Sequence, residues 1–423
     1  MTQQRLTIIT LVVSTAALWM AATVHTATQV QFAALPSQPP APVDNPTTPE
    51  KVALGRLLFW DPILSGTRDV ACATCHHPAL GYADGLDVSI GVNGVGLGTA
   101  RHFSPDQPSR FVKRNSQTVL NTAFNGLSPT GGHDPAAAPM FWDSRVLSLE
   151  SQALEPIKAL EEMRGDGSES HEAIDHAVAR VAAVGEYRRL FAAAFGTSAA
   201  VTAPNIARAI AAFERTLVAT NSPFDRYMRG DTTAMTAQQV RGMRTFQAIG
   251  CANCHSGPMF SDYKTHVLGV PENRKLPAPD DGADSRYAFR TPSLRNLAFT
   301  APYMHNGTLT SLDAVLNFYN QVGGGRGGRR GPQDVQDARG PQTNAGPQSQ
   351  GTQGGGGRGR GGRGGTQNPN VARQALDPLL RQLNVRGGRQ DVIAFLGALN
   401  DDGFDKTIPA KVPSGLKPGG RVQ

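Results

Sequence analysis

The chain has 423 residues, which allows two or three domains, and a formal net charge of +7. The charge is concentrated, because residues 323–370 contain seven arginines and two aspartates, a net of +5, and leave +2 for the rest. A nearly neutral body does not predict a nucleic-acid-binding surface. All four cysteines belong to two C-x-x-C-H sequences, which leaves none for a disulfide or a catalytic thiol.

The N-terminus predicts export. Arg5 precedes an apolar run over residues 6–24, the order of regions in a secretory signal, and Ala27 is the best cleavage position. Because the run is long enough to cross a bilayer, residues 1–27 are interpreted as a signal peptide or as an uncleaved membrane anchor. Residues 28–47, rich in Pro, Gln and Ala, predict a flexible leader.

A helix is predicted next, with Thr48 as its N-cap and Pro49 in its first turn. It leads to the first C-x-x-C-H sequence, Cys72-Ala73-Thr74-Cys75-His76. Two thiols at this spacing can each form a thioether to one porphyrin, and the adjoining histidine then lies under the iron as an axial ligand. The sequence therefore predicts a c-type haem held by Cys72, Cys75 and His76.

A second unit repeats this order. Thr236 caps a predicted helix, and Cys251-Ala252-Asn253-Cys254-His255 follows it. A duplication explains the parallel and predicts a second haem on Cys251, Cys254 and His255. The alternative is one zinc ion bound by four thiolates, but a histidine follows both cysteine pairs, and the pairs of structural zinc sites usually lie closer together.

The predicted fold class is mainly α, with two cytochrome c-like haem domains and long loops. The N-terminal domain is expected over residues 48–229 and the C-terminal domain over residues 230–402. Residues 146–229 have helical periodicity, whereas residues 85–114 are rich in Gly, Asn and Ser and predict loops.

The C-terminal domain carries an unusual insertion. Residues 323–370 hold 18 of the 47 glycines and cannot bury enough apolar surface to fold, so they predict disorder. Arg-Gly repeats elsewhere bind RNA, but an exported haem protein favours a solvated linker. A helical pattern returns at 371–383 and 391–400, before a tail at 403–423.

Six further short sequences accompany the two motifs: RNSQTVLN at 114–121, FWDSR at 141–145, QALEP at 152–156, EM at 162–163, TPSLRN at 291–296 and TAPYMHNG at 300–307. Together with two haem motifs about 180 residues apart, they resemble the bacterial di-haem cytochrome c peroxidase and MauG family. The resemblance covers roughly residues 48–322 and 371–402. It implies that the His76 haem reacts with peroxide and that the His255 haem receives electrons.

The resemblance also implies a peroxide pocket. A haem peroxidase needs an open distal face and a group that moves a proton while the O–O bond breaks. The family pattern puts Gln152 and Glu162 there, with Glu162 as acid/base; on sequence alone, Glu162 would be an ordinary solvated charge. Trp142 matches a tryptophan that lies between the haems and relays electrons, the alternative being a buried structural residue.

The distal side of the first haem departs from part of the family. In many members a histidine in a Ser-Ile-Gly-His segment caps the resting iron, and the matching segment here ends in Val92. Valine cannot bind iron, so we predict a five-coordinate first haem that needs no reductive opening. His102, in the same loop, is the rival ligand.

The second haem and a calcium ion complete the expected site. The distal ligand of the second haem is methionine in the peroxidases and tyrosine in MauG-like proteins, and the resemblance points to Tyr319, with Met304 as the alternative ligand and a core-packed Tyr319 as the alternative role. Asn115, Thr300 and Pro302 match positions that hold Ca²⁺ through oxygen ligands.

The expected function is reduction of hydrogen peroxide to water, with electrons from a small cytochrome c or copper protein. One alternative is a MauG-like enzyme, in which high-valent iron oxidises a protein or organic partner. Another is a di-haem electron carrier. We expect a periplasmic protein with no nucleic-acid partner, attached to the membrane only if residues 1–27 are uncleaved; homodimers are common in the family.

Overall fold

The computed structural model describes residues 32–105, 107–196, 201–323, 367–385 and 387–422. Over these residues the fold is mainly helical, as predicted, and the strands form three short antiparallel pairs, β1–β2, β3–β4 and β5–β6. The α-helices are α1 (Pro49–Trp60), α2 (Cys72–Cys75), α3 (Leu149–Gln152), α4 (Glu155–Lys158), α5 (Ala173–Ala183), α6 (Gly185–Phe195), α7 (Ala203–Glu214), α8 (Pro223–Met228), α9 (Ala237–Ala248), α10 (Leu312–Val322) and α11 (Arg389–Gly397). The strands are β1 (Gly94–Val95), β2 (His102–Phe103), β3 (Pro139–Met140), β4 (Val146–Leu147), β5 (Thr265–Val267) and β6 (Ala288–Arg290).

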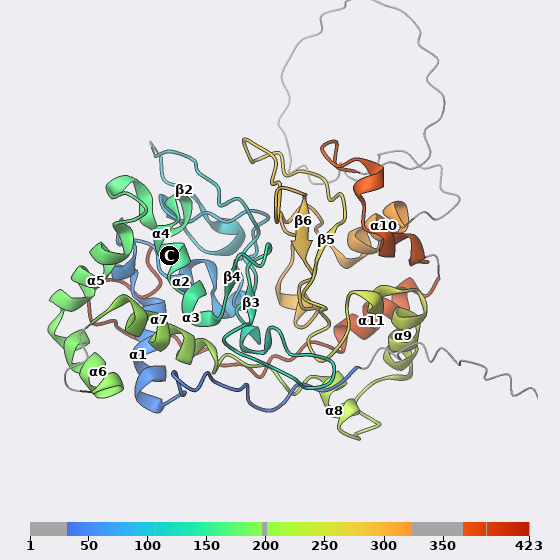
Figure 1. Ribbon diagram of the computed structural model, residues 1–423, viewed down its shortest axis with the longest axis horizontal. Coiled ribbons are helices and arrows are strands. Elements are labelled where there is room, and N and C mark those ends of the chain that lie inside the picture. Colours follow the sequence, from blue (N-terminus) through green and yellow to red (C-terminus); the bar gives the residue numbers. More distant parts are fainter. Residues whose placement is uncertain (1–31, 106, 197–200, 324–366, 386, 423) are drawn as a thin grey trace, which may run out of the picture.

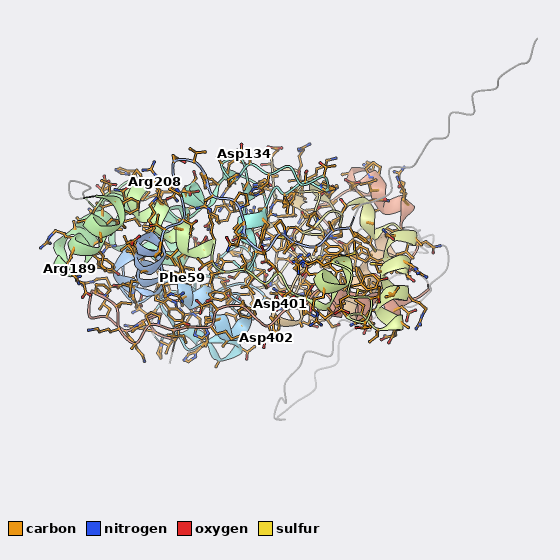
Figure 2. All side chains as sticks on the ribbon, turned by 90° about the horizontal axis from the view of Figure 1, so that it is seen from below. Phe59, Asp134, Arg189, Arg208, Asp401 and Asp402 are labelled. Carbon is orange, nitrogen blue, oxygen red and sulfur yellow. The ribbon has the colours of Figure 1, made fainter. Side chains whose placement is uncertain are left out.

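The elements form two groups with separate cores (Figure 1). Helices α1 and α5–α7 lie at one end, α9–α11 at the other, and strands β3–β6 lie between them. In the N-terminal group, Thr48 caps α1 by accepting a hydrogen bond from the backbone N–H of Lys51, as predicted. Phe59, on the buried face of α1, lies inside this group, whereas Arg189 lies at its outer end (Figure 2).

The helix before each haem motif is packed in the same way. A Cβ atom on Gly55 of α1 would lie 1.9 Å from the carbonyl oxygen of Ala209 in α7. A Cβ atom on Gly242 of α9 would lie 1.9 Å from the carbonyl oxygen of Asp391 in α11. Each glycine therefore lets two helices approach so closely that their backbones touch, which supports the duplication.

Part of the expected leader is packed rather than flexible. Phe32 is buried among four phenylalanine rings of the C-terminal core: Phe224, Phe246, Phe260 and Phe395. Leu35 is 1% exposed, and its backbone N–H donates to Asp225 at 3.0 Å. A few well-placed apolar residues therefore anchor residues 32–47, which composition alone predicts to be flexible.

The C-terminal tail returns to the N-terminal group. Phe404 and Val412 belong to that core, and Thr74, inside the first haem motif, donates its hydroxyl to the carbonyl of Gly419 at 2.8 Å. The chain end lies close to α2 in Figure 1. Residues 403–422 thus pack against the N-terminal group instead of forming a separate tail.

The segment after the insertion is irregular rather than helical. The pattern at 371–383 gives 3₁₀ turns at Arg373–Ala375 and Pro378–Gln382 rather than an α-helix, because Pro378 interrupts it. The predicted signal or anchor and residues 324–366 of the insertion lie outside the described residues, while Asn368 at the end of the insertion is buried. No helix in the described ranges combines the length and apolar character that a membrane span needs.

Candidate active site

One continuous cavity of about 580 Å³ is lined by both C-x-x-C-H motifs. All four thiols are free, and burial raises the pKa of Cys75 and of Cys251 to about 12, so these thiols are protonated at neutral pH. Two C-x-x-C-H motifs on the wall of one large cavity fit the covalent attachment of porphyrins. The cavity-lining residues of the motifs are Cys72, Cys75, His76, Cys251, Cys254 and His255.

Both motif histidines are oriented for iron ligation. His76 Nδ1 lies 3.2 Å from the carbonyl oxygen of Tyr82 and 3.3 Å from the hydroxyl of Ser116. His255 Nδ1 lies 2.9 Å from the carbonyl oxygen of Phe260. These contacts fix each ring through Nδ1 and leave Nε2 available for a metal. Burial lowers the pKa of both rings and so favours the neutral imidazole that binds metals.

Gln152 and Glu162 both line the cavity. Gln152 ends α3, whose N-cap Ser148 accepts a hydrogen bond from the backbone N–H of Ser151. Glu162 lies in a π-helical turn, Leu160–Arg164. Burial raises the pKa of Glu162 to about 7, which nearby Glu161 reinforces and Arg145 opposes. A carboxyl group that titrates near neutrality can both accept and return a proton.

The loop at 89–92 is fixed against this π-helical turn. The backbone N–H of Val92 donates to the carbonyl of Glu161 at 3.2 Å, and the Val92 side chain is buried in the N-terminal core. His102 lies on exposed β2, with Nδ1 3.0 Å from the carbonyl oxygen of Ala100. Neither residue is among the described residues that line the cavity, so the rival ligand His102 is directed elsewhere.

Trp142 lines the cavity and contacts both Asn115 and His305. Its indole N–H donates to the carbonyl of Asn115 at 3.0 Å. Its ring is 6.5 Å from that of His305, which stacks on Phe289 at 3.5 Å between ring centroids. The oxidisable indole is thus held in place by the hydrogen bond of its N–H group and by the contact of its ring with His305.

Both candidate ligands of the second haem line the cavity. Tyr319 belongs to α10, and burial together with the nearby thiols Cys254 and Cys251 raises the pKa of its hydroxyl. Tyr319 therefore lies close to the second motif. Met304 lies in the loop before α10 with a positive φ of 74°.

The three residues expected to bind calcium also border this cavity. The side-chain amide N–H of Asn115 donates to the carbonyl of Leu86 at 2.7 Å, which leaves the amide oxygen available. Thr300 and Pro302 would contribute backbone carbonyls. A set of neutral oxygens suits a hard cation such as Ca²⁺ when water completes the shell.

Comparisons with known proteins identify the family. Residues 49–233 match the family described as di-haem cytochrome c peroxidase. The chain is 40% identical to the methylamine utilization protein MauG of Methylorubrum extorquens over 293 residues, 68% of this chain and 73% of the relative. The chain belongs to the di-haem cytochrome c peroxidase and MauG family. It is therefore an oxidoreductase of the peroxidase class.

Two further members agree with this assignment. The cytochrome c551 peroxidase of Pseudomonas aeruginosa is 33% identical over 325 residues, 74% of this chain and 83% of the relative. A solved MauG-like protein associated with microbial copper homeostasis superimposes with a TM-score of 0.62 at 27% identity, across 87% of this chain and 95% of that one.

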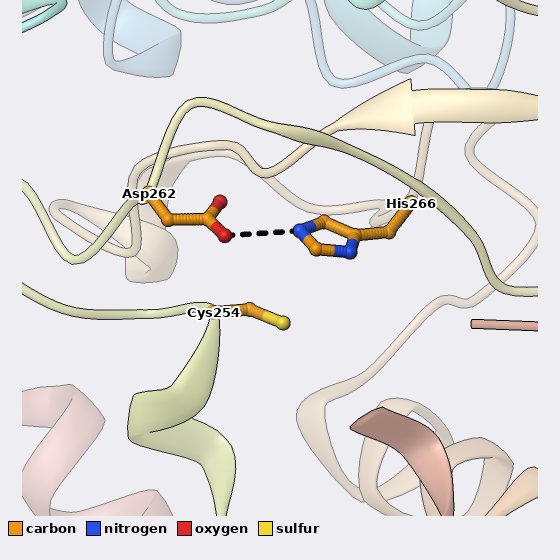
Figure 3. Close-up of side chains that lie close together, drawn as sticks. All are labelled: Cys254, Asp262 and His266. Atoms are coloured by element: carbon orange, nitrogen blue, oxygen red, sulfur yellow. Dashed lines mark hydrogen bonds and ion pairs between the residues drawn. The ribbon is translucent and has the colours of Figure 1, made fainter. Parts of the chain in front are cut away.

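This di-haem peroxidase has an ionic group at the second motif that its sequence does not reveal. His266 Nε2 lies 3.0 Å from Asp262 (Figure 3). Its Nδ1 lies 2.6 Å from Asp377. Asp262 chiefly, with Cys254 and Asp377, raises the pKa of His266 to about 11. The potential ligand atoms of Cys254, Asp262 and His266 lie within 4.8 Å of one another. Because the Cys254 sulfur is expected to bind the porphyrin, we interpret Asp262 and His266 as an ion pair that stabilises the second motif.

Glu214 is a second residue that sequence reasoning missed. It is 4% exposed, lines the cavity and has a carboxylate oxygen, Oε2, without a hydrogen-bond partner among the described residues. Burial raises its pKa to about 8, so the di-haem peroxidase holds, beside Cys72, a second carboxyl group that takes up a proton near neutral pH. At the end of α7, its sequence position indicates only an ordinary helix charge.

Proposed function

We propose that the protein reduces hydrogen peroxide to water with electrons from a small cytochrome c or copper protein. The observation that carries this proposal is the carboxyl group of Glu162, which lines the cavity with Gln152 and has a pKa of about 7. When bound, the two haems supply the peroxide-binding and electron-transfer chemistry.

Glu162 is suited to move a proton within the peroxide. Its carboxylate accepts the proton of one peroxide oxygen and returns it to the other, which leaves as water. The overall reaction, H2O2 + 2 e⁻ + 2 H⁺ → 2 H2O, takes two electrons from the donor protein and two protons from solvent. The amide of Gln152 donates a hydrogen bond that orients the peroxide.

We assign electron entry to the unit around His255 and peroxide reduction to the unit around His76. Support comes from the order of the motifs within the family and from Trp142, which lines the same cavity as both. An indole between two redox centres provides an intermediate step for electron transfer. Tyr319, close to both thiols of the second motif, is the preferred distal ligand there.

The proposal includes a Ca²⁺ ion on Asn115, Thr300 and Pro302, and a periplasmic location. Support for the ion is the set of neutral oxygens on the wall of the cavity. Support for the location is the sequence of residues 1–27 together with two motifs for covalent haem attachment.

A second candidate function is oxidation of a protein or organic partner. The curated relative at 40% identity is named methylamine utilization protein MauG. The tyrosine at 319 also favours this function, because an anionic oxygen ligand stabilises a higher oxidation state of iron than a thioether does.

Steady-state turnover with reduced cytochrome c and hydrogen peroxide tests the proposal. Glu162→Gln should lower kcat/KM for peroxide by about 10²–10⁴-fold, the usual contribution of a general acid/base. Glu161→Gln is the matched control, because Glu161 holds the loop at Val92 through its backbone carbonyl. Wild-type protein that reacts with peroxide but oxidises no cytochrome c or copper protein would favour the second function.

A further inference from the structure

The cations on the cavity wall differ in their partners. Five lysine and arginine residues among the described residues line the cavity. Four of them form ion pairs with carboxylates: Lys113 with Asp280, Arg114 with Asp143 and Asp280, Arg145 with Asp143, and Arg295 with Asp225. The fifth, Arg290, has no carboxylate within ion-pair distance in the part of the chain that the structure describes.

Arg290 is held only by neutral groups of the protein. It ends β6 and is 4% exposed. Its Nε donates to the carbonyl of Phe141 at 2.8 Å, and its Nη2 donates to the side-chain oxygen of Gln117 at 3.3 Å. Asp143 acts on it only at longer range and is already paired with Arg114 and Arg145.

Burial does not remove the charge of Arg290. It lowers the pKa of the guanidinium to about 10, which still leaves a cation at neutral pH. A buried charge without a counter-ion is strongly unfavourable. Since this guanidinium lines a cavity, the molecule that fills the cavity is the natural source of the missing negative charge.

We propose that Arg290 binds a carboxylate of one of the two haems, next to Trp142. A haem carries two carboxylates, and the planar fork of a guanidinium binds a carboxylate more specifically than a lysine does. The backbone N–H of Arg290 also donates to the carbonyl of Trp142 at 2.6 Å, which puts this contact at the expected electron path. Arg290 is a positioning residue, and its role rests on haem binding rather than on the reaction.

Reduction potentials of the two haems, measured by spectroelectrochemistry on the purified holoprotein at pH 8, test this proposal. A buried cation favours the reduced haem, so Arg290→Gln should lower one haem's potential by about 59 mV or more, a tenfold change in the one-electron equilibrium. Arg290→Lys keeps the charge and should shift the potential much less. Arg145→Gln, at a half-exposed arginine paired with Asp143, is the control and should shift it least.

The haem whose reduction potential shifts in Arg290→Gln is the one whose carboxylate Arg290 binds. Equal shifts in Arg290→Gln and Arg290→Lys, or none beyond that of Arg145→Gln, would overturn the proposal. A wild-type potential that depends on chloride or phosphate concentration would also overturn it, since the anion would then be exchangeable.

Gln117→Glu provides a test should the Arg290 variants fail to fold. The new carboxylate would compete with the haem carboxylate for Nη2, so the same haem should show a lower potential and Tm should not rise. A higher Tm with unchanged potentials would contradict the proposal, because it would mean that the guanidinium had lacked an anion in the holoprotein.

Discussion

At the scale of single residues, burial changes the pKa of carboxyl groups and so determines which of them can transfer a proton. Glu161 and Glu162 are adjacent in the chain, and burial raises the pKa of Glu162 to about 7. The same effect neutralises Glu214. The cavity thus holds carboxyl groups that can exchange protons near neutral pH. A solvated glutamate has a lower pKa and exchanges its proton only in acid.

The pH dependence of the peroxide reaction should report Glu162. The first step needs the carboxylate as a base, so the rate should fall as the pH drops through about 7, where Glu162 takes up a proton. Stopped-flow measurement of the Soret change between pH 5 and 9 gives the profile. Glu162→Gln should be slow and should lack this transition; a wild-type rate that rises as the pH is lowered would argue against a base role.

Tyr319→Phe should change the second haem only. Loss of an anionic oxygen ligand should raise its reduction potential and alter its low-spin EPR signal, while the first haem keeps its spectrum. Met304→Leu is the matched variant at the rival position. If Met304→Leu alters the second haem and Tyr319→Phe does not, Met304 is the ligand.

Sequence reasoning reaches some of these residues and not others. The spacing of Cys72, Cys75 and His76 predicts haem attachment directly, because the chemistry requires that spacing. Glu162 emerges only through the family resemblance. Arg290, Glu214 and His266 do not emerge, since what distinguishes each is the set of groups that tertiary folding brings around it.

At the scale of elements, the site depends on close contact between a loop and the π-helical turn Leu160–Arg164. A Cβ atom on Gly91 would lie 2.2 Å from the carbonyl oxygen of Glu161 and 2.5 Å from that of Glu162. Gly91 therefore allows the loop ending in Val92 to lie on the turn that carries Glu162. Sequence predicts loops at 85–114, but not this contact, because it joins residues far apart in the chain.

Gly91→Ala should displace the π-helical turn. We expect a loss of stability of about 1–3 kcal/mol, the usual cost of overpacking, and a slower reaction with peroxide while the second haem is unchanged. Gly167→Ala, just beyond the turn, is the control because no atom lies within 4 Å of its added Cβ. Equal peroxide rates in the two variants would show that the contact does not position Glu162.

At the scale of the whole molecule, both ends of the described chain hold the haem units in place. Residues 32–47 run from the C-terminal core, where Phe32 is buried, to the N-terminal group, where Asn45 donates to Glu150 at 2.7 Å. The tail contacts the first motif through Gly419. Composition predicts a leader and a tail that do not pack against the body. The few buried apolar residues in these segments anchor them, although most of their residues are polar.

A stop codon after Lys411 should therefore destabilise the first haem unit. It removes the buried Val412, the hydrogen bonds of Ser414 to Asp61 and the contact of Gly419 with Thr74, which together should cost about 3 kcal/mol or more. Thermal unfolding followed at the Soret band measures this. Arg421→Ala, whose backbone contacts remain, should change the stability by less than about 0.5 kcal/mol; an unchanged Tm in the truncated protein would contradict the account.

We propose that the His76 haem is open in the resting protein and reacts with peroxide without prior reduction. The most direct measurement is the EPR spectrum of the oxidised holoprotein, followed by stopped-flow mixing of the same sample with hydrogen peroxide. We predict a high-spin ferric signal and a fast Soret change. Low-spin signals alone, with no Soret change until a donor has reduced the second haem, would contradict the claim.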